Sequence, residues 1–222
     1  MFEWIEFKGS LHHHVKQTST PKAMSQRFDA EIASGSLFVP QEQLNGFSFP
    51  LLPVITQQDP SLIQSFAWGL IPGWAKNEDI KKMTLNAKIE TLHEKPAFKD
   101  VLTQRCLVIA NGFYEWQWLD SKGKNKVKYE IGLENEALFA FAGLYSHWVD
   151  AHTGTLKSTC TIITTAANEL MASIHNIKKR MPVILQPKDE QAWLHQASIT
   201  GFAYPYQVPL VAKAMNEHYR LF

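Results

Sequence analysis

A glutamate lies inside a run of aromatic residues near the middle of the chain. Glu115 follows Phe113 and Tyr114 and precedes Trp116, in a segment whose composition is typical of a buried strand. A carboxylate in apolar surroundings has a raised pKa, which suits a general acid or base that works near neutral pH. The alternative is plain strand alternation that turns Glu115 toward solvent. The pattern leaves both open and makes Glu115 a candidate catalytic residue.

A histidine stands close to a basic segment in the last quarter of the chain. The histidine is His175, and three consecutive cations follow it at Lys178, Lys179 and Arg180. A histidine in such a position could transfer protons next to a bound phosphate. The alternative is a structural histidine that happens to precede a solvated charged face.

Two further segments carry residues that are typical of nucleic-acid binding. Asn86 can donate and accept hydrogen bonds, and Lys88, two residues on, is expected on the same face of a strand. Trp74 follows a Pro-Gly pair, so a rigid turn could present its ring for stacking on an unpaired base, worth about 1–3 kcal/mol. The alternative for Trp74 is a ring that covers the edge of a core around Trp68.

The histidines and cysteines do not have the spacing of a metal site. His12, His13 and His14 are adjacent, and neighbouring residues on a strand point to opposite faces. Cys106 and Cys160 lie in apolar runs without CxxC spacing, so we expect buried strand residues rather than a disulfide or a zinc site. We therefore expect no metal and no cofactor.

Composition limits the classes of protein that remain. The chain has 222 residues, 45% of them hydrophobic, and a formal net charge of +1. This charge excludes a uniformly basic nucleic-acid coat but not a local basic groove. No apolar run reaches the length of about 18 residues that a membrane span requires, and the acidic first residues do not resemble a signal peptide. We expect a cytoplasmic protein without a membrane span.

Turn and apolar patterns predict many short strands and a few helices. Thr20 before Pro21 predicts a helix that runs to about Ala33, and Pro187 before acidic residues predicts another that runs through Trp193. A turn at 120–124 is expected to join two strands as a hairpin. The predicted strands are Leu52–Thr56, Ser65–Leu70, Arg105–Ile109, Phe113–Trp116, Val127–Leu133, Leu138–Leu144, Thr159–Thr165 and Pro182–Leu185.

These elements indicate an α+β fold with a mainly antiparallel core. No repeat, low-complexity block or linker divides the chain, so residues 12–222 are expected to form a single domain. Residues 1–11 precede it as an extension of uncertain origin. The extension could be a natural extra strand, a segment upstream of the functional start, or a remnant added for expression.

The order of the segments along the chain resembles the SRAP family, the SOS-response-associated peptidases. The resemblance runs from about His14 to the C-terminus and implies a single compact domain with a curved, barrel-like β core and peripheral helices. It rests on Trp68–Trp74, Asn86–Thr91, Arg105–Val108, Gly112–Trp116, Ile162–Ala166, Ile174–Asn176 and Arg180–Leu185.

The resemblance also implies a function. SRAP proteins recognise abasic sites in single-stranded DNA and at junctions where a duplex meets a single strand. Their N-terminal cysteine, exposed when the initiator methionine is removed, reacts with the aldehyde of the ring-opened abasic sugar. The product is a thiazolidine DNA–protein crosslink that shields the lesion, and the peptidase label refers to self-processing. We expect a monomer that associates with the nucleoid when it is bound to DNA.

The family's functional residues fall on matching positions of this chain. The resemblance assigns orientation of the N-terminus and lesion to Asn86, acid/base catalysis to Glu115, and proton transfer in ring opening and crosslink reversal to His175. Lys88 stands where family members often carry a phosphate-binding arginine, and it can pair with phosphate only as a point charge. The other DNA-binding candidates are Pro50, Trp74, Thr165, Lys178, Lys179 and Arg180.

The chain departs from the family pattern at the nucleophile. The family's Met-Cys start falls on Leu11 and His12, so histidine stands at the position of the cysteine. A thiazolidine needs a free amine and a thiol on one residue, which neither His12 nor an internal cysteine offers. A second departure, Ile177–Lys179, enlarges the basic loop after His175. Either the start as written is not the functional one, or the chain binds damaged DNA without the covalent step.

Overall fold

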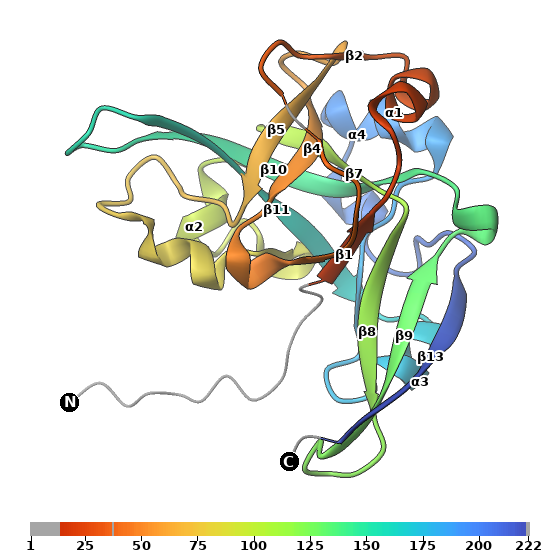
Figure 1. Cartoon of the computed structure of the whole chain (residues 1–222). Coiled ribbons are helices and arrows are strands. Elements are labelled where there is room, and N and C mark those ends of the chain that lie inside the picture. Colours follow the sequence, from red (N-terminus) through yellow and green to blue (C-terminus); the bar gives the residue numbers. More distant parts are fainter. Residues whose placement is uncertain (1–13, 37, 221–222) are drawn as a thin grey trace, which may run out of the picture.

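Two β-sheets organise the chain in the computed structural model, which describes residues 14–36 and 38–220, with side chains to residue 215 (Figure 1). The smaller sheet has five strands in the order β13-β9-β8-β1-β3, and all its neighbouring pairs are antiparallel. Its strands are β1 (His14–Gln17), β3 (Gln41–Asn45), β8 (Gly112–Trp118), β9 (Asn125–Gly132) and β13 (Val211–Arg220).

Five strands of the larger sheet form a closed ring. β11 pairs with β10, β10 with β7, β7 with β4 and β4 with β5, all antiparallel, and β5 returns to β11 in parallel. Closure leaves no unpaired edge within the ring. The ring strands are β4 (Leu51–Thr56), β5 (Leu62–Trp68), β7 (Arg105–Ala110), β10 (Phe139–Val149) and β11 (Leu156–Ala166). The short strands β2 (Glu31–Ile32), β6 (Asn86–Lys88) and β12 (Arg180–Pro182) pair with β5, β11 and β11, respectively.

A glycine allows the ring strands to approach closely. A Cβ atom at Gly143 of β10 would lie 2.8 Å from the Cys106 sulfur, 2.9 Å from the Thr161 carbonyl oxygen and 3.0 Å from a methyl group of Val108. These three neighbours are a backbone atom and two buried side chains, which have little room to move. A larger residue at position 143 would therefore strain the ring.

Helices lie around the sheets rather than between the ring strands (Figure 1). The α-helices are α1 (Pro21–Phe28), α2 (Pro96–Lys99), α3 (Glu169–Ile174) and α4 (Glu190–Leu194). Short 3-10 helices lie in the connecting segments: η1 (Gly46–Ser48), η2 (Glu78–Met83), η3 (Ile89–Thr91), η4 (Glu134–Glu136), η5 (Pro187–Asp189) and η6 (Ile199–Phe202).

The ring strands carry a hydrophobic core on each of their two faces. On one face, Val54, Val108 and Phe141 pack with Phe113 and Ile131 of the five-stranded sheet. On the other face, ring residues pack against α1, α2 and α4, and these contacts bury Met24, Phe98 and Trp193. Because side chains alternate along each strand, the ring can hold the second sheet on one side and helices on the other.

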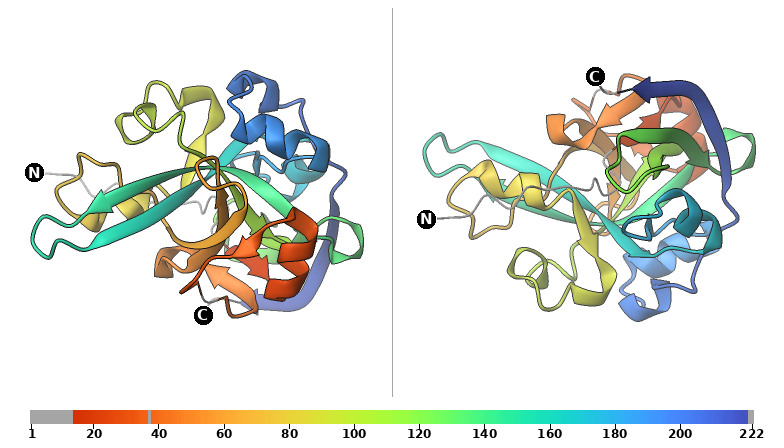
Figure 2. Two further views of the ribbon diagram at one scale, coloured as in Figure 1. Left: turned by 90° about the horizontal axis from the view of Figure 1, so that it is seen from above. Right: turned by 90° about the horizontal axis from the view of Figure 1, so that it is seen from below.

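The far ends of β10 and β11 extend from the rest of the fold as a long hairpin (Figure 2). The hairpin contacts the segment that contains η2. The Trp148 indole donates a hydrogen bond to the Ala75 carbonyl oxygen at 2.7 Å, and Lys157 forms an ion pair with Glu78.

The structure confirms the expected fold class and shows where the predicted elements were wrong. Most of the predicted strands overlap ring strands or β8 and β9, with ends that differ by a few residues. The helix predicted to reach Ala33 ends at Phe28, because Asp29 adopts a left-handed conformation (φ 49°, ψ 47°) and β2 follows. Of Pro182–Leu185, only Pro182 belongs to β12, and Ile184 forms an isolated bridge to Phe141.

Cys106 and Cys160 are buried strand residues of the ring, as expected, and they carry free thiols. Burial raises the pKa of both thiols, and the proximity of Cys160 adds to the effect on Cys106. Among residues 14–36 and 38–220, no helix is both long and apolar enough to cross a membrane.

Candidate active site

Strand β8 turns Glu115 toward the protein interior. Phe113 belongs to the core between the sheets, and Glu115, two residues on, lies on the same face with 2% of its surface exposed. Tyr114 and Trp116 occupy the other face, where Lys128 of β9 lies 4.2 Å and 5.9 Å from their ring centres. Strand alternation is therefore present, but its phase is opposite to the one that would turn Glu115 to solvent.

His175 lies opposite Glu115. Its Nε2 is 4.0 Å from Oε1 of Glu115, and 4% of the residue is exposed. Its Nδ1 lies 3.0 Å from the Arg180 carbonyl oxygen and 3.4 Å from the Arg180 amide nitrogen, so the Arg180 backbone holds the ring with Nε2 toward the carboxylate. The pair presents a carboxylate and an imidazole nitrogen side by side, a combination that can move protons to and from a reacting group.

The Glu115 carboxylate also has a backbone donor. The Trp116 amide donates to Oε1 at 3.1 Å, and a hydrogen bond of this kind stabilises the charged form of the acid. The negative charge of Glu115 also acts on His14. Burial and the positive charge of Lys128 lower the pKa of His14, and Glu115 opposes that shift.

Local structure positions His175 from both sides. Helix α3 begins at Asn168, whose side chain accepts from the Met171 amide at 2.9 Å, and it ends directly before His175. Asn176 is tied to the end of β8: it accepts from the Trp118 amide at 3.1 Å and donates to the Trp118 carbonyl oxygen at 2.8 Å. No pattern in the sequence indicated that Asn176 would join the histidine loop to the strand of Glu115.

The three cations after His175 have different environments. Lys178 and Lys179 are exposed, and the Lys179 backbone is left-handed (φ 48°) and donates to the His175 carbonyl oxygen at 2.8 Å. Arg180 binds Glu90 with two hydrogen bonds of 2.8 Å and the Thr164 carbonyl oxygen with one of 2.7 Å. Its guanidinium thus fastens β12 to η3 and β11.

Asn86 and Lys88 lie on β6, beside β11. Asn86 pairs with Ile162 and Lys88 with Thr164, and β12 pairs with the other edge of this part of β11. Asn86 is half-buried and Lys88 is exposed. Partial burial and the positive charge of Lys88 lower the pKa of Lys178, while Glu115 opposes the shift. The charges of Lys88, Lys178 and Glu115 therefore act on one another in one region of the fold.

Thr165 lies on the face of β11 opposite to that of Thr164. Its hydroxyl accepts from the Tyr204 amide at 2.8 Å, whereas the Thr164 hydroxyl lies 3.3 Å from the Arg180 guanidinium. The threonine nearer to the basic loop is thus Thr164, which the sequence analysis did not single out. The one-residue difference is the alternation of a strand.

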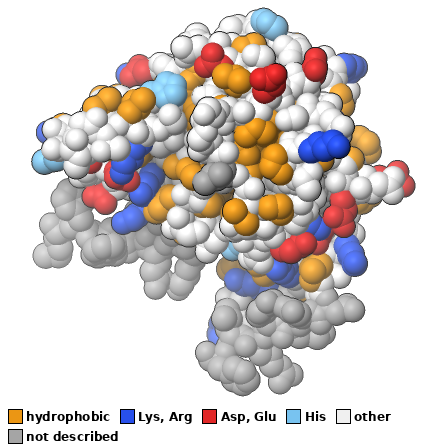
Figure 3. All heavy atoms as spheres, turned by 45° about the horizontal axis from the view of Figure 1, so that its top comes forward, with side chains coloured by type: hydrophobic (Ala, Val, Ile, Leu, Met, Phe, Trp, Pro, Cys, Tyr) orange, Lys and Arg blue, Asp and Glu red, His pale blue; other side chains and the backbone are white. Residues whose placement is uncertain are grey.

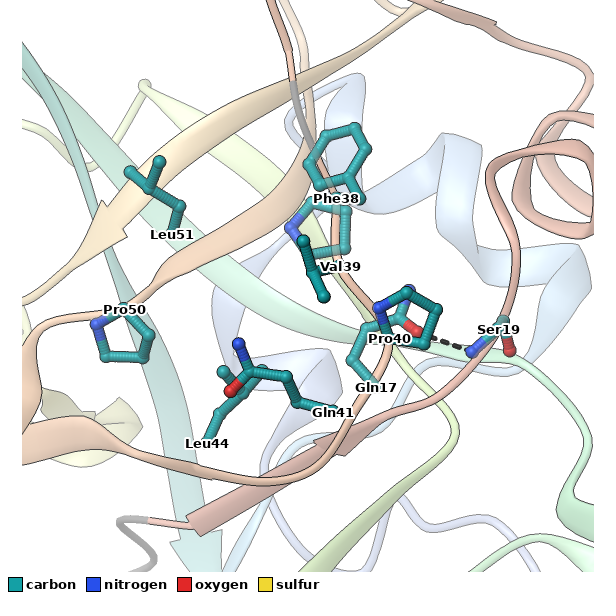
Figure 4. A pocket seen from close by; sticks show the side chains of 10 residues that line it. Gln17, Ser19, Phe38, Val39, Pro40, Gln41, Leu44, Pro50 and Leu51 are labelled. Atoms are coloured by element: carbon teal, nitrogen blue, oxygen red, sulfur yellow. Dashed lines mark hydrogen bonds between the residues drawn. The ribbon is translucent and has the colours of Figure 1, made fainter.

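Trp74 and Pro50 lie outside this group. Trp74 is 53% exposed, and its indole donates to the Pro96 carbonyl oxygen at 3.3 Å. Pro50 lines a separate cavity of about 280 Å³ between β3 and β4, where Pro50 and Leu51 lie across from Pro40 (Figure 4). Leu51 is itself exposed, and the space-filling view shows hydrophobic side chains gathered in the middle of one face with charged ones toward its margin (Figure 3).

His12 and His13 lie outside the described residues. His14 starts β1 opposite Tyr114, the residue before Glu115, and its ring packs edge-on against Trp116 at 4.8 Å. β1 therefore begins beside the Glu115–His175 pair. Within the described ranges, no three His, Cys, Asp or Glu residues gather in a way that could hold a metal ion.

Comparisons with known proteins agree on one family. The family model described as SOS response associated peptidase (SRAP) matches residues 13–216. Abasic site processing protein YoaM of Bacillus subtilis is 47% identical over 146 residues, which cover 65% of this chain and 62% of YoaM. Abasic site processing protein HMCES of Gallus gallus is 31% identical over 159 residues, 62% of this chain and 46% of HMCES. The chain thus aligns with less than two thirds of either relative.

A solved structure supports the same comparison at the level of the fold. A crystal structure of a protein from Bacteroides thetaiotaomicron superposes with a TM-score of 0.80 at 32% identity, over 92% of each chain. A second crystal structure, of a protein from Bordetella bronchiseptica, superposes with a TM-score of 0.73 at 23% identity, over 92% of this chain and 100% of that one.

Proposed function

Because the chain belongs to the SRAP family, whose model matches residues 13–216, we propose that it recognises abasic sites in single-stranded DNA and shields them. The observation that carries the proposal is the buried Glu115–His175 pair, 4.0 Å apart, with the cations Lys88 and Lys178 beside it. Curated relatives are named abasic site processing proteins, which supports the same substrate. The protein would act as a monomer in the cytoplasm, on the nucleoid.

The pair supplies the proton transfers that an abasic sugar requires. The closed sugar is a hemiacetal, and it opens to an aldehyde when one group removes the hydroxyl proton and another protonates the ring oxygen. Glu115 and His175 take these two roles, since a carboxylate and an imidazole side by side can accept and donate protons. Asn86 orients the sugar through an amide that donates and accepts.

The exposed lysines hold the DNA backbone. Lys88, Lys178 and Lys179 contact phosphates as point charges, while Arg180 keeps their loop in place through its pair with Glu90. The exposed Trp74 ring stacks on an unpaired base, and Pro50 lies at the wedge beside a junction. Thr165 supports the pocket from the far face of β11.

The covalent step of the family needs a cysteine at the position of His12. Cys106 and Cys160 cannot replace it, because they are buried in the ring and burial raises the pKa of their thiols. A thiazolidine also needs an amine on the same residue, and both cysteines lie within the chain. The chain as written therefore binds the lesion without the family crosslink.

A denaturing gel tests this function. The chain is incubated with single-stranded DNA that carries one abasic site, beside a version that begins Met-Cys in place of Leu11 and His12. A shifted band only with the second version, abolished by Glu115→Gln, is the expected result. A band with the chain as written would contradict this account of the nucleophile.

The second candidate function is a DNA-binding module without covalent chemistry. The absence of a usable cysteine in the described part of the chain favours it. Binding would rest on Trp74 and the lysines alone, and affinity would fall with salt as phosphate contacts release counterions. No shifted band with either version, together with salt-dependent binding, would support this candidate.

A further inference from the structure

The Arg180 guanidinium reaches across strand β11. β12, which starts at Arg180, pairs with one edge of β11, and β6 pairs with the other edge. The guanidinium donates to the two carboxylate oxygens of Glu90 at 2.8 Å each and to the Thr164 carbonyl oxygen of β11 at 2.7 Å. Glu90 belongs to η3, which directly follows β6. One side chain therefore links the two short strands that flank β11.

The main chain of Arg180 holds the imidazole of His175. The Arg180 carbonyl oxygen lies 3.0 Å from Nδ1 of His175, and the Arg180 amide nitrogen lies 3.4 Å from the same atom. On the other side of the ring, Nε2 lies 4.0 Å from Oε1 of Glu115. A shift of the Arg180 backbone would therefore move the imidazole relative to the carboxylate.

This backbone lies at the end of a β-ladder. Arg180 is the first residue of β12, and its partner Ala166 is the last residue of β11. The three residues before Arg180 are exposed. Segments with few buried contacts open more readily than the centre of a sheet. The Glu90 carboxylate thus restrains Arg180 at a point where the ladder itself restrains it least.

The same contact occupies the guanidinium. Both terminal nitrogens of Arg180 bind Glu90, and the arginine side chain is only 13% exposed. Phosphate is bound by the same fork of donors that binds a carboxylate, so a DNA phosphate would compete with Glu90 for Arg180. Lys88, Lys178 and Lys179, in contrast, are exposed.

We propose that Glu90 is a positioning residue of the candidate site: its carboxylate keeps the Arg180 guanidinium from DNA phosphates and thereby fixes the backbone that orients His175. The effect on phosphate binding rests on the proposed function, because that function supplies the DNA. The effect on His175 rests on contacts within the chain. Glu90 acts through Arg180 and not on the sugar itself.

A second pair of a glutamate and an arginine provides a matched control. Glu190 accepts hydrogen bonds of 2.6 Å and 3.2 Å from Arg27, and this pair joins α4 to α1. Glu90→Gln and Glu190→Gln each remove one carboxylate charge from such a pair, but only Glu90 is bound to the arginine whose backbone holds His175. Glu90→Ala also removes the acceptor that glutamine keeps.

Nitrogen-15 NMR of the His175 ring, recorded on the full chain without DNA, tests the positioning. The ring signals are assigned by their loss in His175→Gln. We expect the Nδ1 and Nε2 signals to shift in Glu90→Gln and further in Glu90→Ala, and to keep their wild-type positions in Glu190→Gln. A merely structural role of Glu90 would lower the stability of the fold and leave the His175 signals of the folded protein unchanged.

The salt dependence of DNA affinity tests the effect on phosphate binding. Affinity of the full chain for single-stranded DNA with one abasic site is measured by fluorescence anisotropy over a series of salt concentrations. In both Glu90 variants the released guanidinium gains a phosphate contact, so the slope of log K against log salt should steepen by about 0.7 for a single strand. Glu190→Gln should leave the slope unchanged.

The two measurements fail separately. Unchanged His175 signals in both Glu90 variants, or an equal shift in Glu190→Gln, overturn the inference and leave the proposed function intact. An unchanged salt slope overturns the part in which Glu90 keeps Arg180 from phosphate. If the wild-type chain shows no preference for abasic over intact DNA, the proposed function fails, and the His175 signals still decide whether Glu90 positions the histidine.

Discussion

Replacing Asn176 by alanine is expected to loosen the loop that carries His175. The variant loses two hydrogen bonds to the Trp118 backbone, of 3.1 Å and 2.8 Å. One such bond contributes about 0.5–1.5 kcal/mol, so the free energy of unfolding should fall by about 1–3 kcal/mol. For a chain of this length, the corresponding decrease in Tm is about 2–12 °C.

Thermal unfolding and hydrogen exchange measure this change at two levels. The Trp118 amide should exchange faster in Asn176→Ala, because its acceptor is gone. Asn176→Asp keeps an acceptor oxygen and loses the donor, so its Tm should lie between those of the wild type and the alanine variant. Asn45→Ala is the control: its exposed side chain accepts one bond, from the Phe47 amide, at the start of η1.

The reasoning would be refuted by an alanine variant with an unchanged Tm and unchanged protection of the Trp118 amide. Such a result would mean that other contacts hold the loop and that Asn176 does not position it. A decrease in Tm as large in the Asn45 variant would show that the loss is not specific to the link between the loop and β8.

Three further predictions concern stability and reactivity. In Glu90, burial opposes the charge, but the hydrogen bond from Arg180, a backbone hydrogen bond and the positive charges of Arg180 and Lys88 together outweigh it and lower the pKa. Glu90→Gln should therefore destabilise at pH 7, and in urea titrations the difference should fade as the pH drops below about 4, where an unfolded glutamate is protonated. Gly143→Ala should cost about 1–3 kcal/mol by calorimetry, whereas Gly201→Ala, which meets no atom within 4 Å, should be nearly neutral. Neither cysteine should react with a disulfide reagent until denaturant is added, and prompt labelling of the native protein would contradict their burial.

Apolar segments of the fold could be predicted from the sequence, and polar ones could not. β7 is mostly apolar and buried at every position, and β11 contains the buried stretch Thr159–Thr165, which is rich in β-branched residues, so both leave a clear signal. β3 consists of Gln41–Asn45, with only Leu44 buried, and it lies at the edge of its sheet, where a polar strand is tolerated. β6 has three residues, too few to show the alternation of polar and apolar residues that predicts a strand.

The candidate site was predictable by residue type but not by orientation. Glu115 alternates with its neighbours as in any strand, and only pairing with β1 and β9 decides which set faces the interior. The same one-residue ambiguity separates Thr164 from Thr165. The ion pair between Glu90 and Arg180 could not be predicted from the sequence either. The two residues are far apart in the chain and meet only when β12 pairs with β11.

Ring closure between β5 and β11 sets the order in which the protein can assemble during synthesis. Trp68 pairs with Cys160, and a ribosome needs about 5–20 s to make the roughly 90 residues between them. Until then β5 presents an open edge to other chains, a known route to aggregation. His175 emerges later still, so the newly made chain can close the ring before it can form the Glu115–His175 pair.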